Sequence, residues 1–267
     1  MMADVSAIID DLRAEHHALD ELVADLDEPA WDLDTPAETW MIRDQISHLA
    51  FFDEAARLAV ADPARFNDRL QEIAADIQGF VDEPVTRGRA LRSDEVLEWW
   101  RRARAEMLHA FDAMDTSGRV PWFGPPMSPA SFVTARLMET WAHGQDIVDA
   151  LGISRLPTTR LRHVAYIGVR ARRNSYSARG MEMPEAEVRV TLDGPGGARW
   201  IWNEDATDSV TGDALDFCLV VTQRRHPDDT DLAIDGPLAE EWMSIAQAFA
   251  GPPGTGRAPG QFPKPVA

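Results

Sequence analysis

Residues 135–147 read ARLMETWAHGQDI and combine titratable side chains with a nearly continuous apolar surface. On a helix of about 3.6 residues per turn, Glu139, His143 and Asp146 stand at positions i, i+4 and i+7 and share one narrow stripe. Most of the remaining circumference is apolar, with Leu137, Met138, Trp141, Ile147, Val148 and Leu151. We therefore expect a helix that is buried nearly all round and directs its charges inward.

Two interpretations of the Glu139 and His143 pair follow from this pattern. A buried carboxylate beside a buried imidazole is costly unless the two are paired, hydrogen-bonded or bound to a metal. Charge pairs at i and i+4 are common on helices, so an ordinary ion pair is the first interpretation. The second is a metal site that takes further ligands from other segments of the chain.

The composition indicates a globular protein with two domains. A chain of 267 residues is long enough for two modest domains, each with its own core. Its 45% hydrophobic and 27% charged residues are typical of soluble globular proteins. The formal net charge of −19, from 45 acidic and 26 basic residues, disfavours nonspecific binding to nucleic acid or anionic lipid.

Cysteine usage and the N-terminus bear on the compartment. Cys218 is the single cysteine, so no intrachain disulfide is possible and a reducing compartment is the simplest expectation. It lies in an apolar run, which favours a packed thiol over a nucleophile. Residues 1–5 contain no basic region or apolar signal core, and no apolar run reaches membrane-spanning length. We expect a cytoplasmic protein without a membrane partner.

Apolar periodicity predicts four principal helices in a first domain over residues 1–153. They are expected over residues 5–26, from 39–44 to 61, from Ser93 through 111, and through the opening stretch, with a further helical segment over 66–80. Residues 118–126 are too rich in proline for a helix. Four helices with one interrupted crossover predict a four-helix bundle, a fold that readily builds metal sites from facing helices.

Two further histidines fall on these helices. His48 lies among Ile46, Leu49 and Phe52 on the second helix, and His16 lies on the apolar stripe of the first. A lone histidine in such a place is more often structural than functional. We expect His16 to be a residue at the edge of the core with a hydrogen-bond partner.

Past Gly152 the pattern changes to that of a smaller α+β domain over residues 154–250. Residues 187–192 alternate as a strand, 194–197 form a turn and 198–202 return, which predicts a hairpin. The other elements expected here are helices over 161–173, 211–222 and 238–249 and a short strand over 231–234. Residues 251–267 are expected to form an irregular tail.

Three segments of the bundle, residues 39–50, 120–125 and 139–147, resemble the mycothiol-dependent maleylpyruvate isomerase family. That family belongs to the DinB-like metal-binding bundles. The likeness continues more weakly in the second domain, where residues 212–224 are similar to the family's carboxy-terminal helix. The resemblance implies an N-terminal DinB-like four-helix bundle followed by a smaller α+β domain, in an actinobacterial branch of the family.

The resemblance also implies the ligands of a divalent metal, typically Zn²⁺. They are His48, Glu139 and His143, a set that leaves a coordination position open, as in catalytic rather than structural zinc sites. Asp146 then either orients an imidazole from outside the ligand set or lies at a surface-directed end of the helix.

A cosubstrate and an arginine follow from the same resemblance. The open position would take the sulfur of mycothiol, the low-molecular-weight thiol of actinobacteria, as a thiolate. That thiolate would attack a small electrophile, in a transferase or a cis-trans isomerase. Arg224 matches the family's functional arginine and would bind a carboxylate or enolate of the substrate. Capping of a helix end is an equal alternative for Arg224 and for Arg225.

Departures from the family pattern leave the substrate open. Residues 170–176 and 223–229 differ from the isomerase, which argues against maleylpyruvate itself. Two other functions compete with the thiol-dependent enzyme. One is a metal-dependent hydrolase in which Asp146 or Glu139 assists an activated water. The other is a non-catalytic protein that binds metal or a small thiol.

Overall fold

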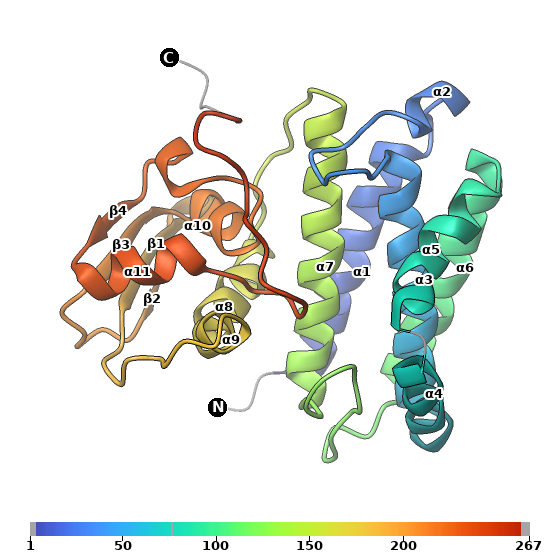
Figure 1. The fold of residues 1–267 in the computed structure, drawn as a ribbon, viewed down its shortest axis with the longest axis horizontal. Coiled ribbons are helices and arrows are strands. Elements are labelled where there is room, and N and C mark those ends of the chain that lie inside the picture. Colours follow the sequence, from blue (N-terminus) through green and yellow to red (C-terminus); the bar gives the residue numbers. More distant parts are fainter. Residues whose placement is uncertain (1–3, 76, 263–267) are drawn as a thin grey trace. The chain divides into compact units, whose positions relative to one another are not determined.

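The computed structural model describes residues 4–75 and 77–262 (Figure 1). Its contacts divide the molecule into two compact units, Met1–Arg155 and Leu156–Ala267. Long helices make up the first unit, and the second combines shorter helices with a four-stranded sheet. The predicted α+β class, with a bundle first, is therefore confirmed. The predicted domain limits, 1–153, 154–250 and a tail over 251–267, stay a prediction.

Unit 1 is a four-helix bundle, as predicted (Figure 1). Its principal helices are α1 (Val5–Val23), α3 (Ile42–Ala61), α6 (Ser93–Asp112) and α7 (Pro129–Ala150). Helix α3 packs against α6 and α7, and α1 packs against α7 and α6. The apolar stripes read from the sequence thus meet in one core, whose buried members include Leu19, Val23, Ile42, Ile46, Leu49, Trp99, Trp100 and Ile147.

The opening stretch of the sequence lies in α7. Ser128 caps this helix, because its hydroxyl accepts a hydrogen bond from the backbone N–H of Ser131 at 3.2 Å. Every residue from 140 to 148 is buried, which confirms the expectation of a helix covered nearly all round. Polar side chains on α7 therefore find their partners inside the bundle.

The connection between α3 and α6 differs from the prediction of one helix over residues 66–80. It contains α4 (Pro63–Ala75) and α5 (Ile77–Arg89), and the short helix α2 (Glu28–Trp31) precedes α3. Helix α4 starts earlier than predicted, because proline is well suited to the first helical position. Helix α5 extends beyond the prediction while packing against α3.

Unit 2 is built around a sheet with the strand order β2-β1-β3-β4. The strands are β1 (Arg189–Gly194), β2 (Ala198–Trp202), β3 (Ser209–Asp213) and β4 (Ala233–Asp235). β1 and β2 form the predicted antiparallel hairpin, β1 pairs with β3 in parallel, and β4 pairs antiparallel with β3. The helices of this unit are α8 (Leu161–Arg170), α9 (Arg172–Ala178), α10 (Ala214–Val221) and α11 (Pro237–Ile245).

The helix predicted over residues 211–222 is wrong at its start, because residues 209–213 form a strand inside the sheet. Helix α10 begins after Asp213, whose carboxylate caps it by accepting from the N–H of Leu215 at 2.7 Å. The helix is apolar and buried, and Cys218 on it is fully buried with Sγ 3.5 Å from the carbonyl oxygen of Leu161. In the described part of the chain, no helix has the length and apolarity needed to cross a membrane.

Candidate metal centre

Helices α3 and α7 bring together the three residues predicted to bind a metal. His48 comes from α3, Glu139 and His143 come from α7, and one donor atom of each lies within 4.8 Å of the others. Glu139 Oε2 lies 3.2 Å from His143 Nε2 and 3.8 Å from His48 Nε2. Among the residues that the structure describes, no other group of three histidine, cysteine or acidic side chains has such an arrangement.

The three side chains are largely, but not completely, buried. The side chains of His48, His143 and Glu139 are 20%, 11% and 23% exposed. The Glu139 carboxylate also lies within salt-bridge distance of both imidazoles, so it would pair with either one in its protonated form. An i, i+4 pair on one helix explains only the contact between Glu139 and His143, whereas His48 is brought in by a second helix. Two imidazoles and one carboxylate are ligand types that zinc prefers.

Burial and mutual contact set the charges of this cluster. Burial, together with the neighbouring His143, lowers the pKa of His48 to about 4. Burial alone would raise the pKa of Glu139, but the close contacts of its carboxylate with the imidazoles of His143 and His48 outweigh it and hold the pKa well below the ordinary value. At neutral pH the site therefore offers a neutral His48 imidazole and an ionised carboxylate, the protonation states that metal binding requires.

Gln45 is a residue of the site that the sequence analysis missed. Its Oε1 lies 2.5 Å from Nδ1 of His143, and its Nε2 donates to Oγ1 of Thr35 at 2.8 Å. Gln45 stands one turn before His48 on α3, so its spacing from a predicted ligand could have identified it. The nitrogen of His143 that faces away from Glu139 is thus held by an amide.

Asp146 was assigned two alternative places, and the surface-directed one is wrong. The residue is fully buried on α7. Both ring nitrogens of His143 lie near other groups, Gln45 and Glu139. A role for Asp146 in orienting an imidazole stays a prediction.

Aromatic rings enclose the two imidazoles. Trp40 stacks on His143 with ring centroids 5.9 Å apart and an interplanar angle of 16°, and its ring lies 5.2 Å from that of His48. Phe52, one turn after His48, lies 4.5 Å from it. Phe52 in turn contacts further aromatic side chains, which are Phe51, Phe80, Trp122 and Phe123. This apolar wall reduces the local dielectric constant, which strengthens the electrostatic interactions of the cluster.

His16 differs from its prediction as a residue at the core edge with a hydrogen-bond partner. It is 2% exposed, and neither ring nitrogen has a hydrogen-bond partner among the described residues. The nearest carboxylate is that of Asp53, 4.0 Å from Nε2, and Asp53 itself pairs with Arg136 at 2.8 Å. Burial, with Arg104 and Arg136, holds the pKa of His16 well below its ordinary value.

Arg224, the predicted catalytic residue, lies in unit 2 just after α10. Its Nη1 donates to the carbonyl oxygen of Thr222 at 2.6 Å, and its backbone N–H bonds to Leu219 O at 2.7 Å. Arg225 Nη1 donates to Arg224 O at 2.7 Å. These contacts agree with the capping of a helix end, and the catalytic role of Arg224 stays a prediction.

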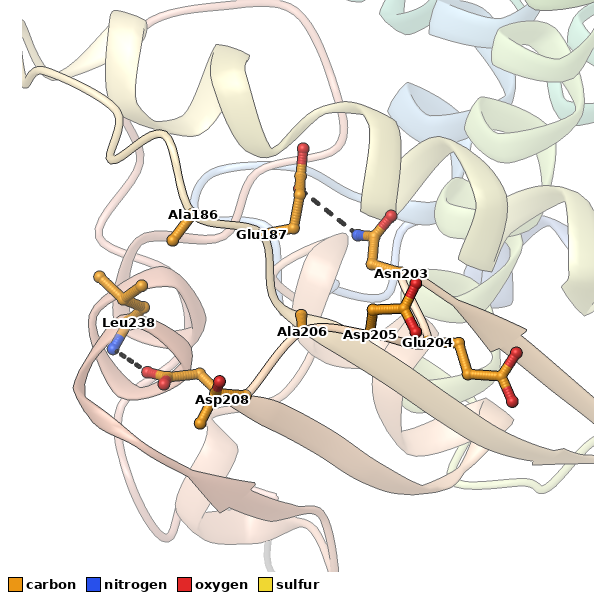
Figure 2. A pocket seen from close by; sticks show the side chains of 9 residues that line it. Ala186, Glu187, Asn203, Glu204, Asp205, Ala206, Asp208 and Leu238 are labelled. Atoms are coloured by element: carbon orange, nitrogen blue, oxygen red, sulfur yellow. Dashed lines mark hydrogen bonds between the residues drawn. The ribbon is translucent and has the colours of Figure 1, made fainter.

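A cavity of about 710 Å³ in unit 2 contains none of the predicted site residues (Figure 2). Two of its acidic side chains, those of Glu187 and Asp208, hold local structure in place. Asn203 donates to Glu187 at 3.4 Å, and Asp208 accepts from the N–H of Leu238 at the start of α11 at 2.7 Å. Part of the cavity lining therefore stabilises a loop and the start of α11.

Comparisons with known proteins agree with this architecture. Residues 12–148 match the profile of the mycothiol maleylpyruvate isomerase N-terminal domain. Two Mycobacterium tuberculosis proteins, each named only as uncharacterized, are 46% identical over 257 residues, covering 96% of this chain and 100% of each relative. The crystal structure of a mycothiol-dependent maleylpyruvate isomerase covers 84% of this chain and 90% of its own, with a TM-score of 0.55 and 16% identity. A histidine-to-alanine mutant of that enzyme gives the same TM-score at 15% identity, and these two matches show a shared fold.

Proposed function

Since this chain belongs to the mycothiol maleylpyruvate isomerase N-terminal domain family, we propose that it is a metal-dependent enzyme that uses mycothiol to attack a small electrophile. The family was recognised from three sequence segments, and that recognition is confirmed. The observation that carries the proposal is the convergence of His48, Glu139 and His143 within 4.8 Å. It supports the metal-site interpretation over a plain ion pair.

The three donors fit a divalent metal, and Zn²⁺ is the proposed ion. Two imidazole nitrogens and one carboxylate oxygen make a catalytic type of ligand set that leaves a position for an exogenous group. A metal bound here would supply Lewis acidity and lower the pKa of a thiol that binds beside it. The side chains of Trp40 and Phe52 would exclude bulk water from the two imidazoles, which they already contact.

The proposed reaction adds a thiol S–H across an electrophilic double bond. The sulfur forms a bond to one carbon, and the other carbon takes up the proton. An isomerase would eliminate the same thiol after rotation about the resulting single bond, whereas a transferase would release the adduct. Arg224 is the proposed group for binding a substrate carboxylate or enolate, through the fixed fork of its guanidinium.

Metal content tests the proposal directly. We expect about one metal ion per wild-type chain by mass spectrometry, and loss of that ion in His48→Ala and in His143→Ala. The matched control is His17→Ala, because the side chain of His17 is 74% exposed on α1. The metal-site assignment would be wrong if the wild type stayed metal-free after reconstitution and all three variants were as stable as the wild type.

Thiol dependence separates the proposal from its alternatives. Mycothiol is titrated into metal-loaded and metal-free protein, and we expect binding to the loaded form alone. An electrophile screen with and without mycothiol follows. Turnover that needs the thiol supports the proposal, turnover without it identifies the hydrolase, and binding without any turnover identifies the non-catalytic protein.

A further inference from the structure

A chain of three hydrogen bonds runs from His143 to the backbone of the loop before α3. His143 Nδ1 meets Gln45 Oε1 at 2.5 Å, Gln45 Nε2 donates to Thr35 Oγ1 at 2.8 Å, and Thr35 Oγ1 donates to Trp40 O at 2.8 Å. Gln45 is fully buried, and Thr35 is 9% exposed. The first two of these hydrogen bonds are therefore buried, and the third is partly buried.

The direction of every proton in this chain follows from its last member. The carbonyl oxygen of Trp40 can only accept, so the hydroxyl of Thr35 donates to it. The oxygen of Thr35 then accepts from Gln45, which turns the amide nitrogen toward Thr35 and the amide oxygen toward His143. An amide oxygen cannot donate, so Nδ1 of His143 must carry the proton. In the neutral form of the imidazole, the lone pair is then on Nε2.

The neighbouring Glu139 carboxylate favours the other tautomer of His143, in which the proton is on Nε2. The ionised carboxylate of Glu139 lies 3.2 Å from Nε2 and would accept an Nε2–H hydrogen bond. With the proton on Nε2, His143 could not bind a metal through that nitrogen. The Gln45 chain opposes this state by offering Nδ1–H an acceptor whose orientation is fixed.

The loop before α3, where the series of hydrogen bonds ends, is held in place by several contacts. Thr39 has a φ of 68°, a left-handed conformation that is strained for a β-branched residue. Its carbonyl oxygen accepts from Arg89 Nη2 at 2.8 Å. Arg89 also forms a bidentate pair with Asp44, and Asp44 Oδ2 accepts from the N–H of Met41 at 2.9 Å. These contacts hold the backbone on both sides of Trp40 and so fix the carbonyl that sets the chain's direction.

We propose that Gln45 is a positioning residue that keeps His143 in its Nδ1–H tautomer, with the direction of the Thr35 hydroxyl set by the carbonyl of Trp40. The consequence for metal binding rests on the proposed function. A partner that fixes the tautomer of a ligating histidine typically changes metal affinity by about tenfold to a hundredfold. The tautomer itself belongs to the metal-free protein and can be measured there.

The first experiment compares metal-free wild type with Gln45→Met, which keeps the side-chain length and removes the amide. Long-range proton–nitrogen NMR spectra of histidine-labelled protein distinguish the two tautomers. We expect Nδ1–H for His143 in the wild type and Nε2–H in Gln45→Met. Zinc affinity, measured by competition with a chromophoric chelator, should fall about tenfold to a hundredfold. A wild type with Nε2–H, or Gln45→Met with unchanged tautomer and affinity, would overturn the proposal.

Thr35 supplies a matched pair of variants that leaves Gln45 in place. Thr35→Val removes the hydroxyl at constant shape, so the amide of Gln45 can turn over and both tautomers should appear. Thr35→Ser keeps the hydroxyl and should behave as wild type, and equal spectra for the two variants would contradict the relay. A wild type that binds no zinc would reject the proposed function, and the tautomer measurements would still decide the role of Gln45.

Discussion

His16 is a buried histidine whose charged form the fold disfavours. Its pKa lies well below the ordinary value of 6.5 because of burial and then of Arg104, Arg136 and Arg13, while Asp53 is the carboxylate that faces it. The unfolded chain therefore binds a proton near pH 6.5 that the folded chain does not. As the pH falls below that value, His16 costs stability at up to about 1.4 kcal/mol per pH unit until the folded pKa is reached.

Replacement of His16 should remove this loss. We expect the free energy of unfolding of His16→Leu, from urea denaturation, to fall less than that of the wild type between neutral pH and about pH 5.5. His17→Gln is the control, because His17 is exposed on the same helix. Equal pH slopes in all three proteins would mean that His16 is protonated in the fold. The result does not depend on metal binding.

At the level of single residues, spacing and family resemblance located the three predicted ligands, which the structure brings together. Glu139 and His143 are separated by one helical turn, so the sequence already places them on one face. Gln45 could have been found only through its one-turn spacing from the predicted ligand His48, and Trp40 offered no such signal. An amide or an indole acquires a role only when another element presents its partner, and here that partner is on α7.

Among the helices, the contact between α5 and α3 depends on one glycine. A Cβ at Gly88 would lie 1.9 Å from Oγ and 2.6 Å from Cβ of Ser47, the residue before His48. Alanine in place of glycine usually stabilises a helix by about 1 kcal/mol. At this position the overlap should outweigh that gain, with a net loss of about 1–3 kcal/mol.

Urea denaturation of Gly88→Ala measures this balance. Gly124→Ala is the comparison, because a Cβ at Gly124 would meet nothing within 4 Å. We expect a lower midpoint for Gly88→Ala and an unchanged one for Gly124→Ala. A gain in stability at Gly88 would show that α5 moves away from α3 without cost.

The sequence predicted the elements that have a local pattern of their own, and it missed strand β3, which depends on pairing with distant segments. Helices α1, α3, α6 and α7 follow from their own apolar periodicity, and the hairpin of β1 and β2 follows from alternation around a glycine-rich turn. Residues 211–213 of strand β3 fell within the predicted helix because an apolar helical run follows them at once. Its extended form depends on pairing with β1 and β4, which no local pattern reveals.

For the molecule as a whole, the division into two units has a consequence for folding. The core cluster that contains Leu19, Trp100 and Ile147 lies entirely within unit 1. We expect the fragment of residues 1–155 to unfold in one cooperative thermal transition, followed by circular dichroism. A gradual loss of signal without a transition would mean that the bundle depends on unit 2.

Fragments that end at different residues test where the first domain ends. The limit predicted from the sequence is residue 153, and the compact unit defined by the contacts includes Arg155. Arg155 Nη2 donates to the carbonyl oxygen of Trp141 at 2.7 Å, and Nη1 lies 3.4 Å from the buried Glu15. The fragment 1–153 should therefore be less stable than 1–155 by about 1 kcal/mol or more.

Cys218 gives the intact chain a useful analytical property. Cys218 is fully buried in α10, and the sequence contains no second cysteine. A short pulse of an alkylating reagent should leave the native protein unlabelled and add a single mass increment to each unfolded molecule. Because Cys218 does not react in the native protein, any sulfhydryl signal in an assay that consumes thiol comes from the added cosubstrate.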